Sequence, residues 1–418
     1  MRAVGLLCLL AACGPSSDSV PAPVPAPVPA PTPAPAPVPS AELCAPDVVF
    51  SPPSREVKTP APSQVSPRLE RTRKILERVV RDHGRDPKNP WAIGHAMLAL
   101  GSDVALTNGI DATDWLFGEY ARVRPVQGAA GLTFPARRGK IRIEPHTDLI
   151  LKALTETGVS PDRPVEVDGK TYAVGDLYRG SLCRAWVDGP SVAFQSWNDT
   201  PWALQGLAAW APAGLAWQAD GGHAMTLDGF THEVVVKLSE ETAFMRDAMD
   251  AGTRVEKRRQ GIFAYTCGGA HLLQGAAYAV ARGFGRPEDR VALNKEVEVL
   301  FWRLELELGI YDQALQQAPQ HRVVLLEQRM KFLGHFLETQ HKLAATGLYV
   351  PNEVQRTALE SALTELMATV EALEADHVFD NLDAVHRENE QTYLDFIGDA
   401  AHAIRGIRLA TGEQGVAL

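Results

Sequence analysis

The sequence lacks the short motifs that mark common enzyme classes. It contains no nucleotide-binding glycine loop, no Gly-x-Ser-x-Gly and no His-Glu-x-x-His. Positive charge is also in short supply, because 41 Lys and Arg stand against 51 Asp and Glu, a net charge of −10. Phosphate contacts need clustered cations, so this balance excludes a general nucleic-acid binder. Location and architecture are therefore the more informative signals.

The first residues predict export. Residues 1–12 combine one positive charge at Arg2 with a short apolar run, which is typical of a signal peptide and too short to span a bilayer. The sequence Leu10-Ala11-Ala12-Cys13 resembles the bacterial lipobox. That resemblance implies cleavage before Cys13, lipidation of Cys13 and a stable membrane anchor in the cell envelope. Gly14 is not an aspartate, so no inner-membrane retention signal is implied and the outer membrane is expected.

Residues 13–67 predict a stalk that follows the lipidated cysteine. Proline alternates with small residues over 20–39, which prevents helix and sheet and favours polyproline II. At roughly 3.1 Å per residue this linker reaches about 60 Å. A second proline-rich stretch, 51–67, extends the stalk or wraps around the domain that follows.

Five cysteines are present, of which Cys8 leaves with the signal and Cys13 takes lipid. Cys44, Cys183 and Cys267 remain in an oxidising compartment, where they allow one disulfide and one free thiol. A Cys44–Cys183 bond would tie the stalk to the domain and leave Cys267 free. The spacing alone leaves the pairing open.

Residues 68–287 predict a domain of helical hairpins. Apolar, small-residue helices open near Pro90, Pro145, Pro201 and Thr266, about 55 to 65 residues apart. Between them lie second helices and short alternating strands, with a hairpin signal over 165–174. Repeats of this length predict a ring or solenoid, because each hairpin needs a neighbour to cover its apolar face.

This texture resembles the α/α-toroid architecture of terpenoid cyclases, protein prenyltransferases and many polysaccharide-acting enzymes. The resemblance implies a mainly α fold: an α/α-toroid-like ring of helical hairpins with small β-hairpin insertions. Residues 288–418 carry four longer, more charged helical patterns at 288–317, 321–346, 352–376 and 382–409. These helices are expected either to close the ring or to form a separate C-terminal bundle.

The most apolar helix-length stretch, 261–285, predicts an inner helix of this ring. The amino-terminal ends of inner helices would meet at one face and gather their residues around one cavity. Candidates for catalysis there are His95, His146, Asp148, Tyr265, Cys267 and His271. Candidates for ligand binding are Trp91, Asp199 and Trp202.

Cys267 and His271 are four residues apart, so a helix would place them on one face. Thiolate and imidazole are zinc ligands, and Asp148 or His95 would supply a further one. Alternatively, His146 with Asp148, or Tyr265 with His271, would act as acid and base on a sugar or acyl group. Zinc is therefore the cofactor that this group of residues suggests.

A di-iron bundle is a competing hypothesis for the C-terminal part. Glu338-x-x-His341 and Asp399-x-x-His402 have the spacing used by such bundles. However, the apolar stripe of the last helix passes through Ile397, Ala401 and Ile404. That stripe predicts that Asp399 faces solvent, which argues against a di-iron site.

Three functions stay open at this level. The first is a lipid-anchored envelope protein that binds a small molecule, a sugar or a protein partner. The second is an enzyme, metal-dependent or carbohydrate-acting, with a cavity at the mouth of the toroid. The third is a structural scaffold of an envelope assembly.

Overall fold

The computed structural model describes residues 48–51, 65–126, 129–186, 200–255, 263 and 266–413. In these ranges the chain forms thirteen α-helices and eight short strands. The strands of the described residues pair in two-stranded antiparallel hairpins. The protein is therefore mainly helical with small β insertions, as the sequence predicts.

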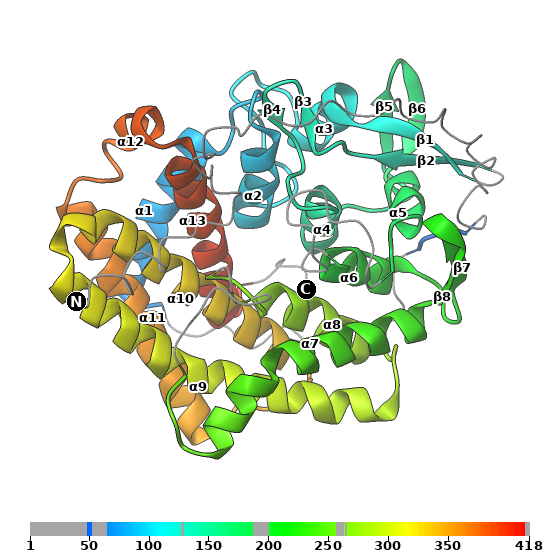
Figure 1. Ribbon diagram of the computed structural model, residues 1–418. Coiled ribbons are helices and arrows are strands. Elements are labelled where there is room, and N and C mark those ends of the chain that lie inside the picture. The colour runs from blue at the N-terminus through cyan, green and yellow to red at the C-terminus, as the bar shows by residue number, and fades with distance from the viewer. Residues whose placement is uncertain are drawn as a thin grey trace, which may run out of the picture.

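Six helices form a closed inner ring (Figure 1). Each contacts the next in chain order, and the last contacts the first. They are α2 (Pro90–Leu100), α4 (Leu149–Glu156), α6 (Thr200–Trp210), α8 (Ala270–Ala281), α10 (Arg322–Ala345) and α13 (Glu390–Ala410). This closure is the α/α-toroid arrangement expected from the repeat.

The other long helices lie outside the ring, each against one or two inner helices. They are α1 (Pro67–His83), α3 (Ala112–Tyr120), α5 (Gly175–Leu182), α7 (Leu227–Asp250), α9 (Pro287–Gln317) and α11 (Glu353–Ala375). A short helix, α12 (Leu382–Glu388), precedes α13. Segment 288–418 thus supplies two inner helices, α10 and α13, which contact α8 and α2 of the preceding segment.

Local start signals set the inner helices. Asn89 caps α2 by accepting the Ala92 N–H at 3.1 Å, and Pro90 follows it in the first turn. At α4 the helix begins later than Pro145 suggests, because Asp148 adopts a left-handed backbone with φ of 65°. The Glu144 side chain accepts the Ile150 N–H at 2.9 Å in place of an ordinary cap.

The predicted hairpin over 165–174 is present. Strands β5 (Pro164–Val167) and β6 (Lys170–Ala173) pair in antiparallel register. Asp168 and Gly169 between them both have positive φ, as a type I′ turn requires. The other pairs are β1 (Arg122–Val126) with β2 (Ala129–Thr133), β3 (Arg137–Arg138) with β4 (Ile141–Arg142), and β7 (Ala216–Ala219) with β8 (His223–Thr226).

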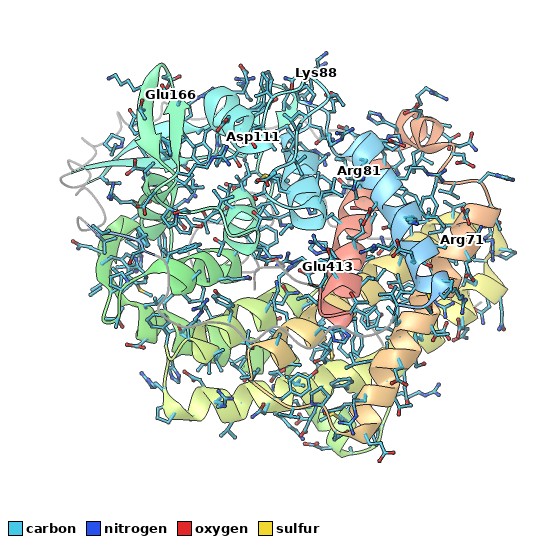
Figure 2. All side chains as sticks on the ribbon, turned by 180° about the vertical axis from the view of Figure 1, so that it is seen from behind. Arg71, Arg81, Lys88, Asp111, Glu166 and Glu413 are labelled. Atoms are coloured by element: carbon cyan, nitrogen blue, oxygen red, sulfur yellow. The ribbon has the colours of Figure 1, made fainter. Side chains whose placement is uncertain are left out.

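The basic run over 68–81 forms most of α1. Leu76 and its apolar neighbours are buried, whereas Arg71 and Arg81, both labelled along α1 in Figure 2, are exposed. Arg71 pairs with Glu374 of α11 at 2.8 Å. Exposed pairs of this kind contribute little stability, so this face is a solvated one.

One helix boundary differs from the sequence prediction. The pattern over 382–409 predicts a single helix, but the chain breaks between α12 and α13. Asn389 is extended, with φ of −152°, and its side chain caps α13 by accepting the Thr392 N–H at 3.1 Å. A good N-cap residue inside an otherwise helical pattern thus starts a new helix.

Helix α13 is buried on every side from Tyr393 to Ile407, because α1, α2, α10 and α12 surround it. Although it is buried, α13 contains charged residues, among them Asp395, Asp399 and Arg405. No helix in the described ranges is both long and apolar enough to cross a membrane.

Two glycines let α10 and α13 approach closely. A Cβ on Gly406 of α13 would lie 2.9 Å from Leu337 Cβ and 3.0 Å from the Glu338 backbone nitrogen. A Cβ on Gly334 of α10 would lie 2.9 Å from the Ala403 nitrogen. Each helix therefore needs a residue without a side chain where it meets the other.

We expect Gly406→Ala to lower the free energy of unfolding by about 1–3 kcal/mol, because the added methyl group forces the two backbones apart. Gly309→Ala on the exposed face of α9 is the matched control, since nothing lies within 4 Å of its new Cβ. That control should gain about 0.5–1 kcal/mol from helix propensity. Urea unfolding of both variants makes the comparison, and equal stability of Gly406→Ala and the parent would contradict this packing.

Candidate functional site

A set of buried rings, here called the imidazole layer, lines the inside of the toroid. Each inner helix or its leading turn supplies one: His95, His146, Trp202, His271, His335 and His402. Ring centroids lie 4.7 Å apart for His146 and Trp202, and 5.1 Å apart for Trp202 and His271. The separations are 4.8 Å for His271 and His335, 3.9 Å for His335 and His402, and 5.5 Å for His402 and His95. The toroid thus brings together residues more than 300 positions apart.

Cys267 joins this layer from the turn that leads into α8. Its Sγ, a nitrogen of His271 and a nitrogen of His335 all lie within 4.8 Å of one another. All three side chains are buried. The sequence predicts the Cys267–His271 pair, and the structure adds His335 from α10 as a third potential ligand.

His402 and His95 each have one ring nitrogen held by a hydrogen bond. His402 donates its Nδ1–H to Glu338 Oε2 at 2.6 Å, because a carboxylate can only accept. His95 donates its Nδ1–H to the Trp91 carbonyl at 2.9 Å. These bonds fix the tautomers and leave each Nε2 with a lone pair, which is how metal-binding histidines are commonly oriented. His335, Glu338 and His402 form a second group with ligand atoms within 4.8 Å.

Burial keeps these imidazoles neutral. It lowers the pKa of His271 and of His335 well below the ordinary value, and the Lys152 ammonium lowers both further. Burial also lowers the pKa of His402, although Glu338 opposes the shift. Neutral imidazole is the form that binds metal ions.

On one side of the imidazole layer lies a buried ionic network, here called the cationic layer: Lys152, Glu156, Glu338, Lys342 and Arg405. Glu156 accepts from Lys342 Nζ at 2.6 Å and pairs with Arg405 Nε at 2.9 Å. Burial alone raises the pKa of Glu156, but Lys152, Lys342 and Arg405 together lower it to about 2. Glu156 is therefore ionised, and this layer holds fixed charges in the interior.

On the other side lies the acidic layer: Glu327, Lys331, Asp395 and Asp399. The prediction that Asp399 faces solvent is wrong, because its side chain is buried and lies 3.4 Å from Lys331 Nζ. The apolar stripe of α13 predicted a solvent-exposed opposite face, but other elements enclose this helix on all sides. Burial raises the pKa of Asp399 well above its ordinary value, although the Lys331 ammonium opposes the shift. Burial likewise raises the pKa of Asp395 to about 6. His335 Nε2 lies 4.0 Å from Asp399 Oδ1.

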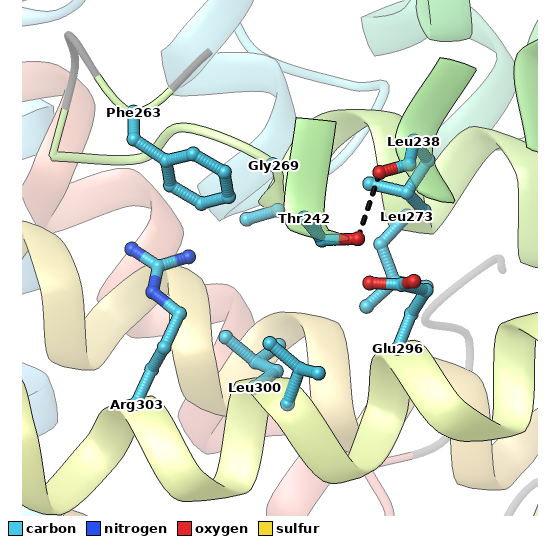
Figure 3. Close-up of a pocket in the computed structure, with 10 residues that line it drawn as sticks. Leu238, Thr242, Phe263, Gly269, Leu273, Glu296, Leu300 and Arg303 are labelled. Carbon is cyan, nitrogen blue, oxygen red and sulfur yellow. Dashed lines mark hydrogen bonds between the residues drawn. The ribbon is translucent and has the colours of Figure 1, made fainter. Parts of the chain in front are cut away.

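The turn that carries Cys267 is held by side chains of α9 and α10. Arg303 of α9 donates to the Gly268 carbonyl at 3.0 Å, and the Thr266 hydroxyl donates to Gln328 of α10. Arg303 and Glu296 also line a small cavity between α7, α8 and α9 (Figure 3). Its volume of about 20 Å³ suits one water molecule. This cavity lies outside the inner ring and is too small for a substrate.

The structure brings some of the predicted site residues together and separates others. Trp91 stacks on His95 at 4.0 Å, which places both at the edge of the imidazole layer. Asp148 instead pairs with Arg184 at 2.6 Å and accepts from Ser181 at 3.0 Å. It therefore serves the α4–α5 contact rather than the group around Cys267. Tyr265, Asp199 and Cys13 lie outside the described residues.

The predicted state of the cysteines agrees in part with the structure. Cys267 is buried and is not part of a disulfide. Cys183 is disulfide-bonded. The predicted partner Cys44 lies outside the described residues.

Two residues of the site, Lys152 and His335, escaped the sequence prediction, and so did the pairing of His402 with Glu338. The sequence predicts a Glu338–His341 motif, but Glu338 binds His402 from another helix. The spacing His335-x-x-Glu338 was the available signal. It has meaning only once α10 is known to face the centre of the ring.

Comparison with known proteins supplies no family for this chain. No protein-family model, curated protein or solved structure matches it. The likeness to toroid enzymes is therefore one of architecture, and function has to be argued from the side chains.

Glu144, beside the Asp148–Arg184 pair, generates a testable pH dependence. Burial, followed by the Asp148 carboxylate, raises the pKa of Glu144 from 4.5 to about 8. The folded protein therefore holds a proton there between about pH 4.5 and 8 that the unfolded chain releases. Stability contributed by this group falls as pH rises through that window, with a slope of about 1.4 kcal/mol per pH unit at most.

We expect Glu144→Gln to be near neutral at pH 5 and to raise the free energy of unfolding at pH 8 by about 1 kcal/mol or more, because glutamine keeps the acceptor for Ile150 without the charge. Urea unfolding at both pH values measures this. Glu360→Gln on the exposed face of α11 should show no such pH dependence. A Glu144→Gln effect that is the same at both pH values would refute the raised pKa.

Proposed function

We propose that this protein is a metal-binding lipoprotein of the bacterial cell envelope. A lipid at Cys13 and the stalk over 13–67 would hold the toroid off the membrane. The toroid would bind one transition metal ion, zinc in the first place, and present it to a ligand. The observation that carries the proposal is the group of Cys267, His271 and His335, whose ligand atoms lie within 4.8 Å of one another.

The donor set and its surroundings fit such an ion. Zinc bonds of about 2.0–2.3 Å separate tetrahedral ligand atoms by roughly 3.3–3.8 Å, so these side chains need to close by about 1 Å. His402 Nε2 is the natural fourth ligand, since Glu338 already holds Nδ1 of that ring. His271 Nδ1 and His335 Nδ1 are buried and have no hydrogen-bond partner in the described residues. Coordination would account for buried polar groups that are otherwise costly.

A metal-dependent enzyme is the second candidate. The acidic layer favours it, because Asp399 lies beside His335 and can exchange a proton with a ligand bound there. A zinc ion with an open position polarises carbonyl groups and activates water. Binding alone needs the metal site, whereas catalysis also needs this carboxyl group.

Metal analysis tests the proposal. We expect about one zinc per chain in the domain from residue 44 onward, purified without chelator, and no more than a tenth of that in His271→Ala, because removal of one of three or four ligands weakens binding strongly. His321→Ala, an exposed histidine, is the matched control and should keep its metal. Glu338→Gln should weaken affinity about 10–100-fold through loss of the carboxylate behind His402. No metal in the parent, or equal metal in His271→Ala, would refute the site.

Anchoring is tested independently of the metal. Full-length protein produced in a bacterial host should take up labelled fatty acid and partition into detergent, and Cys13→Ser should do neither, because only the cysteine thiol accepts the diacylglycerol. Cys267→Ser is the matched control, since that thiol is buried in the domain. Labelling of Cys13→Ser at the parent level would contradict the lipobox assignment.

A further inference from the structure

We propose that the inside of the toroid also binds a small monoanion, held by the ammonium group of Lys152. This site goes beyond the proposed metal site and does not use its ligands. The ligand class is a halide or the carboxylate of a small organic acid. Both offer one negative charge to the same donor, and the test below separates them.

Lys152 is a buried cation without a hydrogen bond. It lies on α4, 1% exposed, and its Nζ has no hydrogen-bond partner in the described residues. The nearest charge is Glu156 Oε1 at 3.7 Å, and the Trp202 ring lies 5.6 Å away. A buried ammonium that makes no hydrogen bond is a costly group, so an additional acceptor is expected next to it.

The carboxylates near Lys152 are already engaged. Glu156 Oε1 accepts from Lys342 Nζ at 2.6 Å and from Gln205 Nε2 at 2.8 Å, and its other oxygen pairs with Arg405. Glu338 accepts from His402 at 2.6 Å and also faces Lys342 and Arg405 at 3.4 and 3.5 Å. Glu156 Oε2 faces Arg405, and the Glu156 oxygen nearest to Lys152 stays 3.7 Å from Nζ, beyond hydrogen-bond distance.

The charge count in this layer leaves one positive charge over. Lys152, Lys342 and Arg405 carry three positive charges, and Glu156 and Glu338 carry two negative ones. One monoanion balances the layer, whereas a dianion such as phosphate would leave an excess negative charge.

Lys152 Nζ lies beside the imidazole layer, 5.6 Å from the centre of the Trp202 ring. The Lys152 charge acts on His95, His271, His335 and His402, each of which has its pKa lowered first by burial and in part by this ammonium. A metal ion in the same layer would add positive charge and strengthen anion binding, but the ammonium alone suffices for it.

Chloride NMR with competition tests the site. We expect excess broadening of the ³⁵Cl signal by the parent protein, with and without zinc, at fixed ionic strength. Lys152→Met should lose it, with affinity weaker by about tenfold or more, because a charge-assisted bond is removed. Lys170→Met, an exposed lysine in the β5–β6 hairpin, is the matched control and should behave as the parent. Sodium formate and sodium bromide are then compared as competitors. If formate reverses the broadening at the lower concentration, the site prefers carboxylates, and if bromide does, it prefers halides.

A second measurement covers the case in which Lys152→Met does not fold. The melting temperature of the parent should rise with chloride or formate at fixed ionic strength, by mass action on the folded state. Equal broadening by parent and Lys152→Met, or no broadening and no shift in melting temperature of the parent, overturns the anion site. Zinc content of Lys152→Met reports on the metal site separately. If Lys152→Met keeps its zinc but loses anion binding, both sites are supported. If the parent binds the anion but no zinc, only the anion site stands.

Discussion

The closure of the toroid depends on a buried ionic contact between its first and second halves. Glu156 of α4 meets Lys342 of α10 at 2.6 Å and Arg405 of α13 at 2.9 Å, and all three are almost completely buried. Such a network adds little net stability, because desolvation offsets the attraction. A shift of α10 or α13 by one turn would, however, leave a charge buried without a partner, which costs several kcal/mol. The contact therefore specifies the register in which the ring closes.

That register determines the rest of the interior. On α10 the inward residues follow the helical spacing Glu327, Lys331, His335, Glu338 and Lys342, and on α13 they are Asp395, Asp399, His402 and Arg405. Contacts between the two helices occur in the same order along both, from Lys331–Asp395 to His402–Glu338 to Arg405. The two helices are therefore parallel, and the imidazole layer lies between an acidic and a cationic layer. Neutral imidazole groups between these two charged layers would therefore favour a cation next to the acidic layer and an anion next to the cationic layer.

Local start and turn signals allowed the helices and hairpins in the first half of the toroid to be predicted from the sequence. Asn89-Pro90, the Asp168-Gly169 turn and the small-residue stretch that leads into α8 each specify their own element, and the repeat length indicated a toroid. The contribution of α10 and α13 was not readable in the same way. Their charges look like those of surface helices, and only closure of the ring reveals that Lys331, Glu338 and Asp399 point inward. The partner of Glu338 could not be found for the same reason, since His402 lies 64 residues away.

The apolar core of this fold lies between the two layers of helices, not at the centre of the ring. Leu293, Val297 and Leu300 of α9 belong to the same buried cluster as Phe336 of α10. The Phe336 ring lies 5.6 Å from the Phe301 ring of α9. Hydrophobic burial between inner and outer helices thus stabilises the toroid. The inward positions are left to histidine, cysteine and ionised residues that a core of apolar side chains would replace at equal or lower cost. Stability therefore does not explain them, whereas the proposed binding of ions at the centre would.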